Sequence, residues 1–169
     1  MPTLHVHEIK ALALQSHSDP LLREQLFAAL LGDDRTEAVQ AAWTLTHLPP
    51  KDNNHIANHR EELTHTAIST PDPSLRRLTL TLLERLDWSA PDDPPEHYMR
   101  LLDFCLRHMM LADEAYGVRS LCIKLAYKLS LPYPELLDEL RRSLLLLEPS
   151  ELGSGVRCTR NKILKQLTP

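Results

Sequence analysis

Four similar stretches decide the fold: TEAVQAAWTLTHL (36–48), PSLRRLTLTLLERL (73–86), YGVRSLCIKLAYKL (116–129) and SGVRCTRNKILKQL (154–167). With one apolar residue of each stretch aligned, they recur after 36, 43 and 38 residues; those residues are Val39, Leu75, Val118 and Val156. Within each stretch, apolar residues recur three and four positions apart, which is the spacing of one face of an α-helix. The sequence therefore predicts one amphipathic helix that recurs along the chain.

Segments rich in proline and aspartate separate further stretches with the same helical spacing. The composition agrees, because 35 Leu stand against 5 Ile and 4 Val, and leucine favours helices where β-branched residues favour strands. No run of β-branched residues alternates with the period of a strand. We expect an all-α protein of about nine helices, at residues 4–16, 20–31, 35–48, 52–68, 73–87, 95–110, 115–130, 134–147 and 154–167.

A repeat of this length with two helices in each unit is typical of an α-solenoid. Residues 20–48 resemble a complete HEAT repeat, with Pro20 in the first helix, Asp33 and Asp34 in the turn, and Ala38-Val39 opening the second helix. The resemblance implies a right-handed α–α superhelix, here a single domain over residues 1–169. We expect helix 4–16 to cap its N-terminal end and the repeats to span about 19–48, 52–87, 95–130 and 133–167.

The resemblance also implies a structural ladder, because HEAT proteins tend to pair a turn aspartate with an arginine of the second helix between stacked units. The residues at these positions are Asp72, Arg76, Asp113, Arg119 and Arg157. The last unit has Glu151 in place of the aspartate, and the first has Gln40 in place of the arginine. HEAT repeats occur in scaffolds, carriers and enzymes, so the resemblance specifies an architecture and no single function.

Charge, cysteines and motifs exclude several other classes of protein. The net charge is −4, with −6 over residues 1–95 and +2 over residues 96–169, and a general nucleic-acid binder is usually basic overall. The three cysteines form no CxxC, which fits a reducing compartment. No GxGxxG, Walker, HExxH or GxSxG motif occurs. With neither a membrane-spanning segment nor a signal peptide in the pattern, we expect a cytoplasmic protein that does not bind membranes.

A stripe of cations is the first candidate site. Positions four residues apart on the second helices of successive units share one helix face, and the cations on that face are Arg77, Arg85, Lys124, Lys128 and Lys162. Such helices line the concave face of HEAT solenoids, so the resemblance predicts a basic inner groove that attracts an acidic partner. The alternative is an ordinary solvated face, because exposed helix positions favour lysine and arginine in any case.

Histidines form a second candidate. His55 and His59 are one helical turn apart, and Glu62 follows, so the three side chains could contribute to a divalent metal site. The alternative is a solvated helix face, which suits the very polar surrounding segment, and we therefore predict neither a metal nor another cofactor.

No catalytic set of residues is recognisable, so we expect a non-catalytic scaffold or interaction module. It would bind a protein partner, with an acidic segment as a candidate ligand, on the concave surface of its second helices. The alternative is a nucleic-acid-binding protein similar to the HEAT-like alkylpurine DNA glycosylases. For that alternative, the only pairing of a tryptophan with an acid that the sequence offers is Trp88 with Asp87 or Asp92.

Overall fold

The computed structural model describes residues 3–89 and 92–168, and these residues form helices and no strands. Ten α-helices and two short 3-10 helices lie in this part of the chain. The chain divides into two compact units, Met1–Leu86 and Asp87–Pro169. The prediction of an all-α fold built from helical repeats is confirmed. The predicted repeats 19–48 and 52–87 fall essentially in the first unit, and 95–130 and 133–167 fall in the second.

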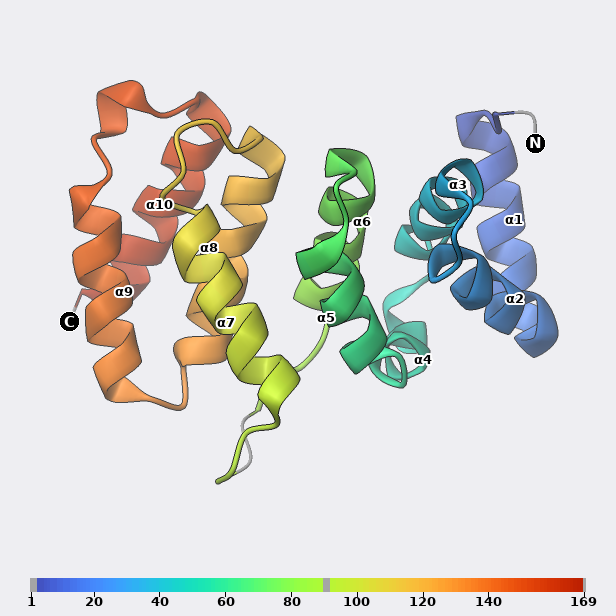
Figure 1. Ribbon diagram of the computed structural model, residues 1–169, viewed down its shortest axis with the longest axis horizontal. Coiled ribbons are helices and arrows are strands. Elements are labelled where there is room, and N and C mark those ends of the chain that lie inside the picture. Colours follow the sequence, from blue (N-terminus) through green and yellow to red (C-terminus); the bar gives the residue numbers. More distant parts are fainter. Residues whose placement is uncertain (1–2, 90–91, 169) are drawn as a thin grey trace. The chain divides into compact units, whose positions relative to one another are not determined.

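The first unit contains two antiparallel helix pairs and an N-terminal helix. Its elements are α1 (Val6–Ser18), α2 (Pro20–Leu30), α3 (Arg35–Thr46), η1 (Pro50–Asp52), α4 (Asn53–Ala57), α5 (Arg60–Ser69) and α6 (Pro73–Glu84). Helix α2 pairs with α3, α5 pairs with α6, and α3 packs against α6, while α1 packs on both α2 and α3 (Figure 1). Phe27, Leu45, Leu63 and Leu82 are fully buried between these helices.

Aspartate side chains define where three of these helices begin. Asp19 accepts a hydrogen bond from the backbone N–H of Leu22 at 3.1 Å, and Asp34 accepts one from Glu37 N–H at 2.9 Å. Asp72 accepts two such bonds at the start of α6. Each carboxylate satisfies N–H groups that the first helical turn leaves without partners. The Asp-Pro pairs at the starts of α2 and α6 add a proline at the first helical position, which lacks the N–H in any case.

The prediction of one continuous helix over residues 52–68 is wrong. The segment contains two helices, α4 and α5, which are separated at Asn58 and His59. His59 leaves the α-helical conformation, with φ −108° and ψ 19°, and its ring stacks on Phe27 at a centroid distance of 4.1 Å. The stacking on the neighbouring α2, together with the weak helix propensity of the asparagines around it, outweighs the helical spacing of the segment.

The second unit contains two further antiparallel pairs. Its elements are α7 (Glu96–His108), α8 (Tyr116–Ser130), α9 (Pro134–Leu146), η2 (Pro149–Glu151) and α10 (Ser154–Leu167). Helix α7 pairs with α8, α9 pairs with α10, and α8 packs against α10 (Figure 1). Leu101, Cys122, Leu125, Leu140 and Val156 are fully buried in its core. This unit therefore stacks one hairpin on the next, so each hairpin buries an apolar stripe that it could not bury alone.

Candidate functional site

Helices α8 and α10 carry an unusual distribution of charge. Together they contain seven lysine and arginine residues and no aspartate or glutamate, whereas α7 and α9 contain five acidic and four basic residues. Two of the seven, Arg119 and Arg160, are buried and bind backbone carbonyls. The other five are Lys124, Lys128, Arg157, Lys162 and Lys165. All five are exposed except Lys128, which is half-buried, so the outward sides of these two helices are positively charged.

The two helices run parallel with their lysines at matching heights. Tyr116, at the start of α8, lies against Gly153 at the start of α10, where an added Cβ would come within 3.2 Å of the ring. Near the opposite ends of the same helices, Tyr127 and Gln166 line one cavity. This register sets Lys124 and Lys162 at similar positions along their two helices. We call Lys124, Tyr127, Lys128, Lys162 and Gln166 the α8–α10 surface.

Neighbouring carboxylates do not neutralise the two exposed lysines of this surface, Lys124 and Lys162. Within the part of the chain that the structure describes, neither Lys124 nor Lys162 has a carboxylate at ion-pair distance. An exposed lysine without a partner keeps its full charge toward solvent and attracts anions over roughly one Debye length, about 8–10 Å at physiological salt. The α8–α10 surface can therefore attract an anionic group from solution.

A cavity of about 370 Å³ adjoins the α8–α10 surface, at the ends of α8 and α10 and the start of α9. Half of its lining residues are apolar, two are polar and two are charged: Tyr127, Leu131, Pro134, Leu137, Asp138, Arg141, Gln166 and Leu167. Asp138 is paired with Arg142. Arg141 is half-buried and has no ion-pair partner among the described residues. The cavity thus combines apolar walls with an available guanidinium group.

The other two cations of the predicted stripe belong to the first unit, so the structure groups only Lys124, Lys128 and Lys162 within one unit. Arg77 is exposed on α6. Arg85 instead holds its own unit together, because its guanidinium donates to Asn53 Oδ1 at 2.6 and 3.0 Å, to Pro49 O at 3.1 Å and to Thr46 O at 3.3 Å. Burial lowers the pKa of Arg85, and the Asp52 charge opposes that shift. These hydrogen bonds leave Arg85 little capacity to bind a partner.

The predicted ladder residues lie at the junctions between helices. Asp72, only 6% exposed, caps α6 and is also paired with Arg35 of α3, so it links the two helix pairs of the first unit. Burial alone would raise the pKa of Asp72, but hydrogen bonds from Leu75 N–H, Arg35 and Ser74 N–H, together with the Arg35 charge, hold the pKa below its ordinary value. Arg76 donates to Ala67 O at 2.9 Å and to Thr70 O at 2.6 Å.

In the second unit, Arg119 donates to Met109 O at 3.1 Å. Asp113 and Arg157 are exposed, and the neighbouring Glu114 and Arg160 make other contacts. Glu114 accepts a hydrogen bond from Ala115 N–H at 3.0 Å and pairs with His108 at 2.7 Å. Arg160 donates to Leu144 O at 2.9 Å.

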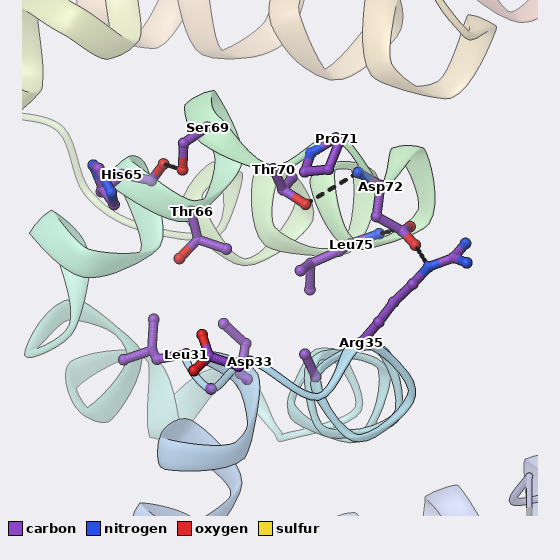
Figure 2. Close-up of a pocket in the computed structure, with 13 residues that line it drawn as sticks. Leu31, Asp33, Arg35, His65, Thr66, Ser69, Thr70, Pro71, Asp72 and Leu75 are labelled. Carbon is purple, nitrogen blue, oxygen red and sulfur yellow. Dashed lines mark hydrogen bonds and ion pairs between the residues drawn. The ribbon is translucent and has the colours of Figure 1, made fainter.

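The first unit has a cavity of about 450 Å³ between the α2–α3 turn and the α5–α6 turn. Figure 2 shows Arg35 crossing from α3 to Asp72 at one end of it, with His65 and Ser69 toward the other end. Asp33 lies on the α2–α3 side, and Leu31 and Leu75 add apolar walls. The lining mixes both signs of charge with hydroxyl groups, and no set of side chains in it converges on one type of ligand.

The histidine candidates are not brought together. His59 stacks on Phe27 and pairs with Glu24 at 3.2 Å, whereas His55 lies on the separate helix α4 and Glu62 is exposed on α5. In residues 3–89 and 92–168, no group of three or more His, Cys, Asp or Glu side chains is arranged to hold a metal ion. The break between α4 and α5 removes the one-turn spacing on which the metal hypothesis depended.

Trp88 is also unavailable as a surface group. It is 5% exposed, and its ring packs edge-on against Tyr98 at 5.7 Å. A buried ring cannot stack on an extruded base, so the pairing with Asp87 or Asp92 does not form an exposed site. The thiols of Cys105 and Cys122 are buried as well, and burial, followed by the neighbouring Cys122, raises the pKa of Cys105. A raised pKa keeps a thiol protonated and unreactive.

Comparison with known proteins identifies the family. A family model described as a HEAT repeat domain matches residues 2–167, which is nearly the whole chain. The protein therefore belongs to the HEAT repeat domain family, whose repeats generally mediate protein–protein interaction. No curated protein and no solved structure matches the chain. Among the described residues, no helix is both long enough and apolar enough to cross a lipid bilayer.

Proposed function

We propose that this protein is a non-catalytic interaction module that binds a protein partner through the α8–α10 surface. The observation that carries the proposal is the charge on the outward sides of α8 and α10, which have five cations besides the buried Arg119 and Arg160 and no carboxylate. Lys124 and Lys162 lie at matching heights on neighbouring parallel helices, so they act on the same part of a partner. Charges of this kind speed association and select a complementary surface more than they add affinity.

The same charges indicate the chemical character of the partner. Lys124 and Lys162 are exposed on helices that contain no aspartate or glutamate, and such charges attract acidic proteins and repel basic ones. The family supports a protein as the partner, since HEAT repeats generally mediate protein–protein interaction. The net charge of −4 and the burial of Trp88 and Tyr98 argue against a general nucleic-acid binder, which would be basic and would expose stacking rings.

A pair of charge reversals tests the proposal. The double variant Lys124→Glu/Lys162→Glu changes two exposed residues, so we expect it to fold normally. Tagged wild-type and variant proteins are purified from the cells that produce the protein, and each co-purifying protein is then prepared separately for direct binding measurements. We expect at least one direct partner whose affinity falls about tenfold or more in the variant and weakens with salt in the wild type.

The matched control is Lys10→Glu/Arg100→Glu, which makes the same change in net charge at two exposed positions, one in each unit. The control should retain the partner. If every direct partner binds the wild type and the Lys124/Lys162 variant equally well at each salt concentration, the α8–α10 surface is not the binding site.

A further inference from the structure

The cavity beside the α8–α10 surface indicates what the partner carries. Resting on the function proposed above, we infer that the ligand is an acidic segment with one large apolar side chain, which enters the cavity lined by Tyr127, Leu131 and Leu167. The acidic residues of the segment lie along Lys124, Lys128 and Lys162.

The apolar side chain follows from the walls of the cavity. Leu131 is 50% exposed, although it is a large apolar residue at the end of α8. Leu137 and Pro134 of α9 and Leu167 of α10 complete the apolar wall, and the volume of about 370 Å³ falls in the range of small ligand pockets. A leucine or aromatic side chain that entered this space would remove its own apolar surface and that of Leu131 from water.

The acidic character follows from the groups around the cavity. Arg141 lines it without an ion-pair partner among the described residues, and Lys128 is the next residue after Tyr127. The one carboxylate of the lining, Asp138, is already paired with Arg142. A partner carboxylate next to the apolar side chain can therefore bind Arg141 through charge-assisted hydrogen bonds, which are stronger than neutral ones.

A peptide fits these features better than a nucleic acid. The cavity presents leucine and proline side chains to its occupant, and these suit an aliphatic or aromatic side chain. A single strand of DNA or RNA binds best where several exposed rings stack on its bases. Tyr127 is the one aromatic residue in the lining, and it is half-buried. The basic surface and the apolar cavity together therefore select an acidic peptide.

Binding of designed peptides tests the inference. The probe is a fluorescein-labelled peptide of glutamates and glycines with one central leucine, measured by fluorescence anisotropy. Comparison ligands are the same peptide with alanine for leucine, the same peptide with glutamine for glutamate, and a single-stranded DNA oligonucleotide of equal length. The proteins are the wild type, Leu131→Gln as the cavity variant, and Leu111→Gln as its control. Leu111 is similarly exposed, at 43%, but follows α7 at the opposite end of α8.

We expect the leucine peptide to bind best, and its alanine version to bind about tenfold or more weakly because an apolar side chain is no longer buried. The glutamine peptide should lose most of its binding. Leu131→Gln should remove the preference for leucine over alanine, and Leu111→Gln should retain it.

The contrary results separate this inference from the proposed function. If the leucine and alanine peptides bind equally, the cavity takes no side chain, and the inference is overturned while the basic surface stands. If no peptide binds, but a natural partner still depends on Lys124 and Lys162, the ligand chemistry is overturned and the binding function stands. If the oligonucleotide binds more tightly than any peptide, both are overturned.

Discussion

The hydroxyl group of Tyr98 shows how single polar groups fix this helical fold. Tyr98 is 3% exposed, and its hydroxyl donates to Leu129 O at 2.6 Å, which joins α7 to the end of α8. Burial, followed by the nearby Tyr133 hydroxyl, raises the pKa of Tyr98 to about 12 from an ordinary value of 10.0. Because ionisation is harder in the folded protein than in the unfolded chain, the folded state favours the neutral phenol.

The raised pKa predicts a loss of stability at high pH. The contribution of Tyr98 is fully present below pH 10, where the phenol is neutral in both states, and is lost as the pH rises from 10.0 toward about 12. Tyr98→Phe should lower the free energy of unfolding by about 1–2 kcal/mol at pH 7, since Leu129 O loses its donor. Urea unfolding between neutral and alkaline pH measures both effects. An equally steep alkaline loss in the Phe variant would show that Tyr98 is not its source.

At the scale of the helices, arginine side chains connect one helix to the end of the helix before it. Four arginines each donate to a backbone carbonyl at the end of the helix before their own: one does so from α2 to α1, and three do so within the pairs α5–α6, α7–α8 and α9–α10. Arg23 binds Ser16 O at 3.2 Å, Arg76 binds Ala67 O, Arg119 binds Met109 O and Arg160 binds Leu144 O. These carbonyls lie at helix C-termini, where they have no partner within the helix and where the helix dipole favours a cation.

Two arginines of α10 provide a matched test of this role. Arg160→Met should lower the free energy of unfolding by about 1.5–3 kcal/mol, because a buried bond from a charged donor is lost. Arg157→Met, on the exposed side of the same helix, should change it by less than about 0.5 kcal/mol. Thermal and urea unfolding of both variants give the comparison. If the two substitutions lowered the free energy of unfolding equally, Arg160 would not have the stabilising role that its bond to Leu144 O indicates.

The sequence predicted those helices whose positions follow from the spacing of apolar residues and from the residues that begin a helix. Apolar periodicity and Asp-Pro pairs predicted nine helical segments, and eight of them contain a single α-helix of the structure. The break at His59 was missed because it depends on a ring stacked on Phe27, a contact between distant residues. No local pattern records such a contact.

Side-chain roles were harder to predict than helices. Arg157 aligns with Arg76 and Arg119, yet Arg160, one turn later, reaches the carbonyl of the preceding helix. Arg85 has the spacing of an exposed cation, but a nearby turn supplies Asn53 Oδ1 and Pro49 O to its guanidinium. Three residues whose roles were missed, Arg23, Arg85 and Arg160, bind backbone oxygens whose positions emerge only when the helices pack. By contrast, the alignment of the repeats is sufficient to propose that Lys124 and Lys162 occupy similar positions along α8 and α10.

At the scale of the whole molecule, positive charge that is not accompanied by acidic residues is concentrated on helices α8 and α10, which pack against each other. The chain as a whole is acidic, at −4, so a cationic surface on α8 and α10 is a local property that net charge conceals. The two units contain the same kind of helix pair, but α3 and α6 of the first unit each carry a glutamate. We therefore expect partner binding to concentrate on the second unit.

Chemical shift mapping tests that claim most directly. The ¹⁵N-labelled full-length protein is titrated with the glutamate-rich leucine peptide, and backbone amide shifts are followed by NMR. The account predicts that the largest changes cluster at Lys124, Tyr127, Lys128, Leu131, Lys162 and Gln166. Changes that centre instead on the cavity of Figure 2, at His65, Ser69 and Asp72, or that spread evenly over both units, would contradict it.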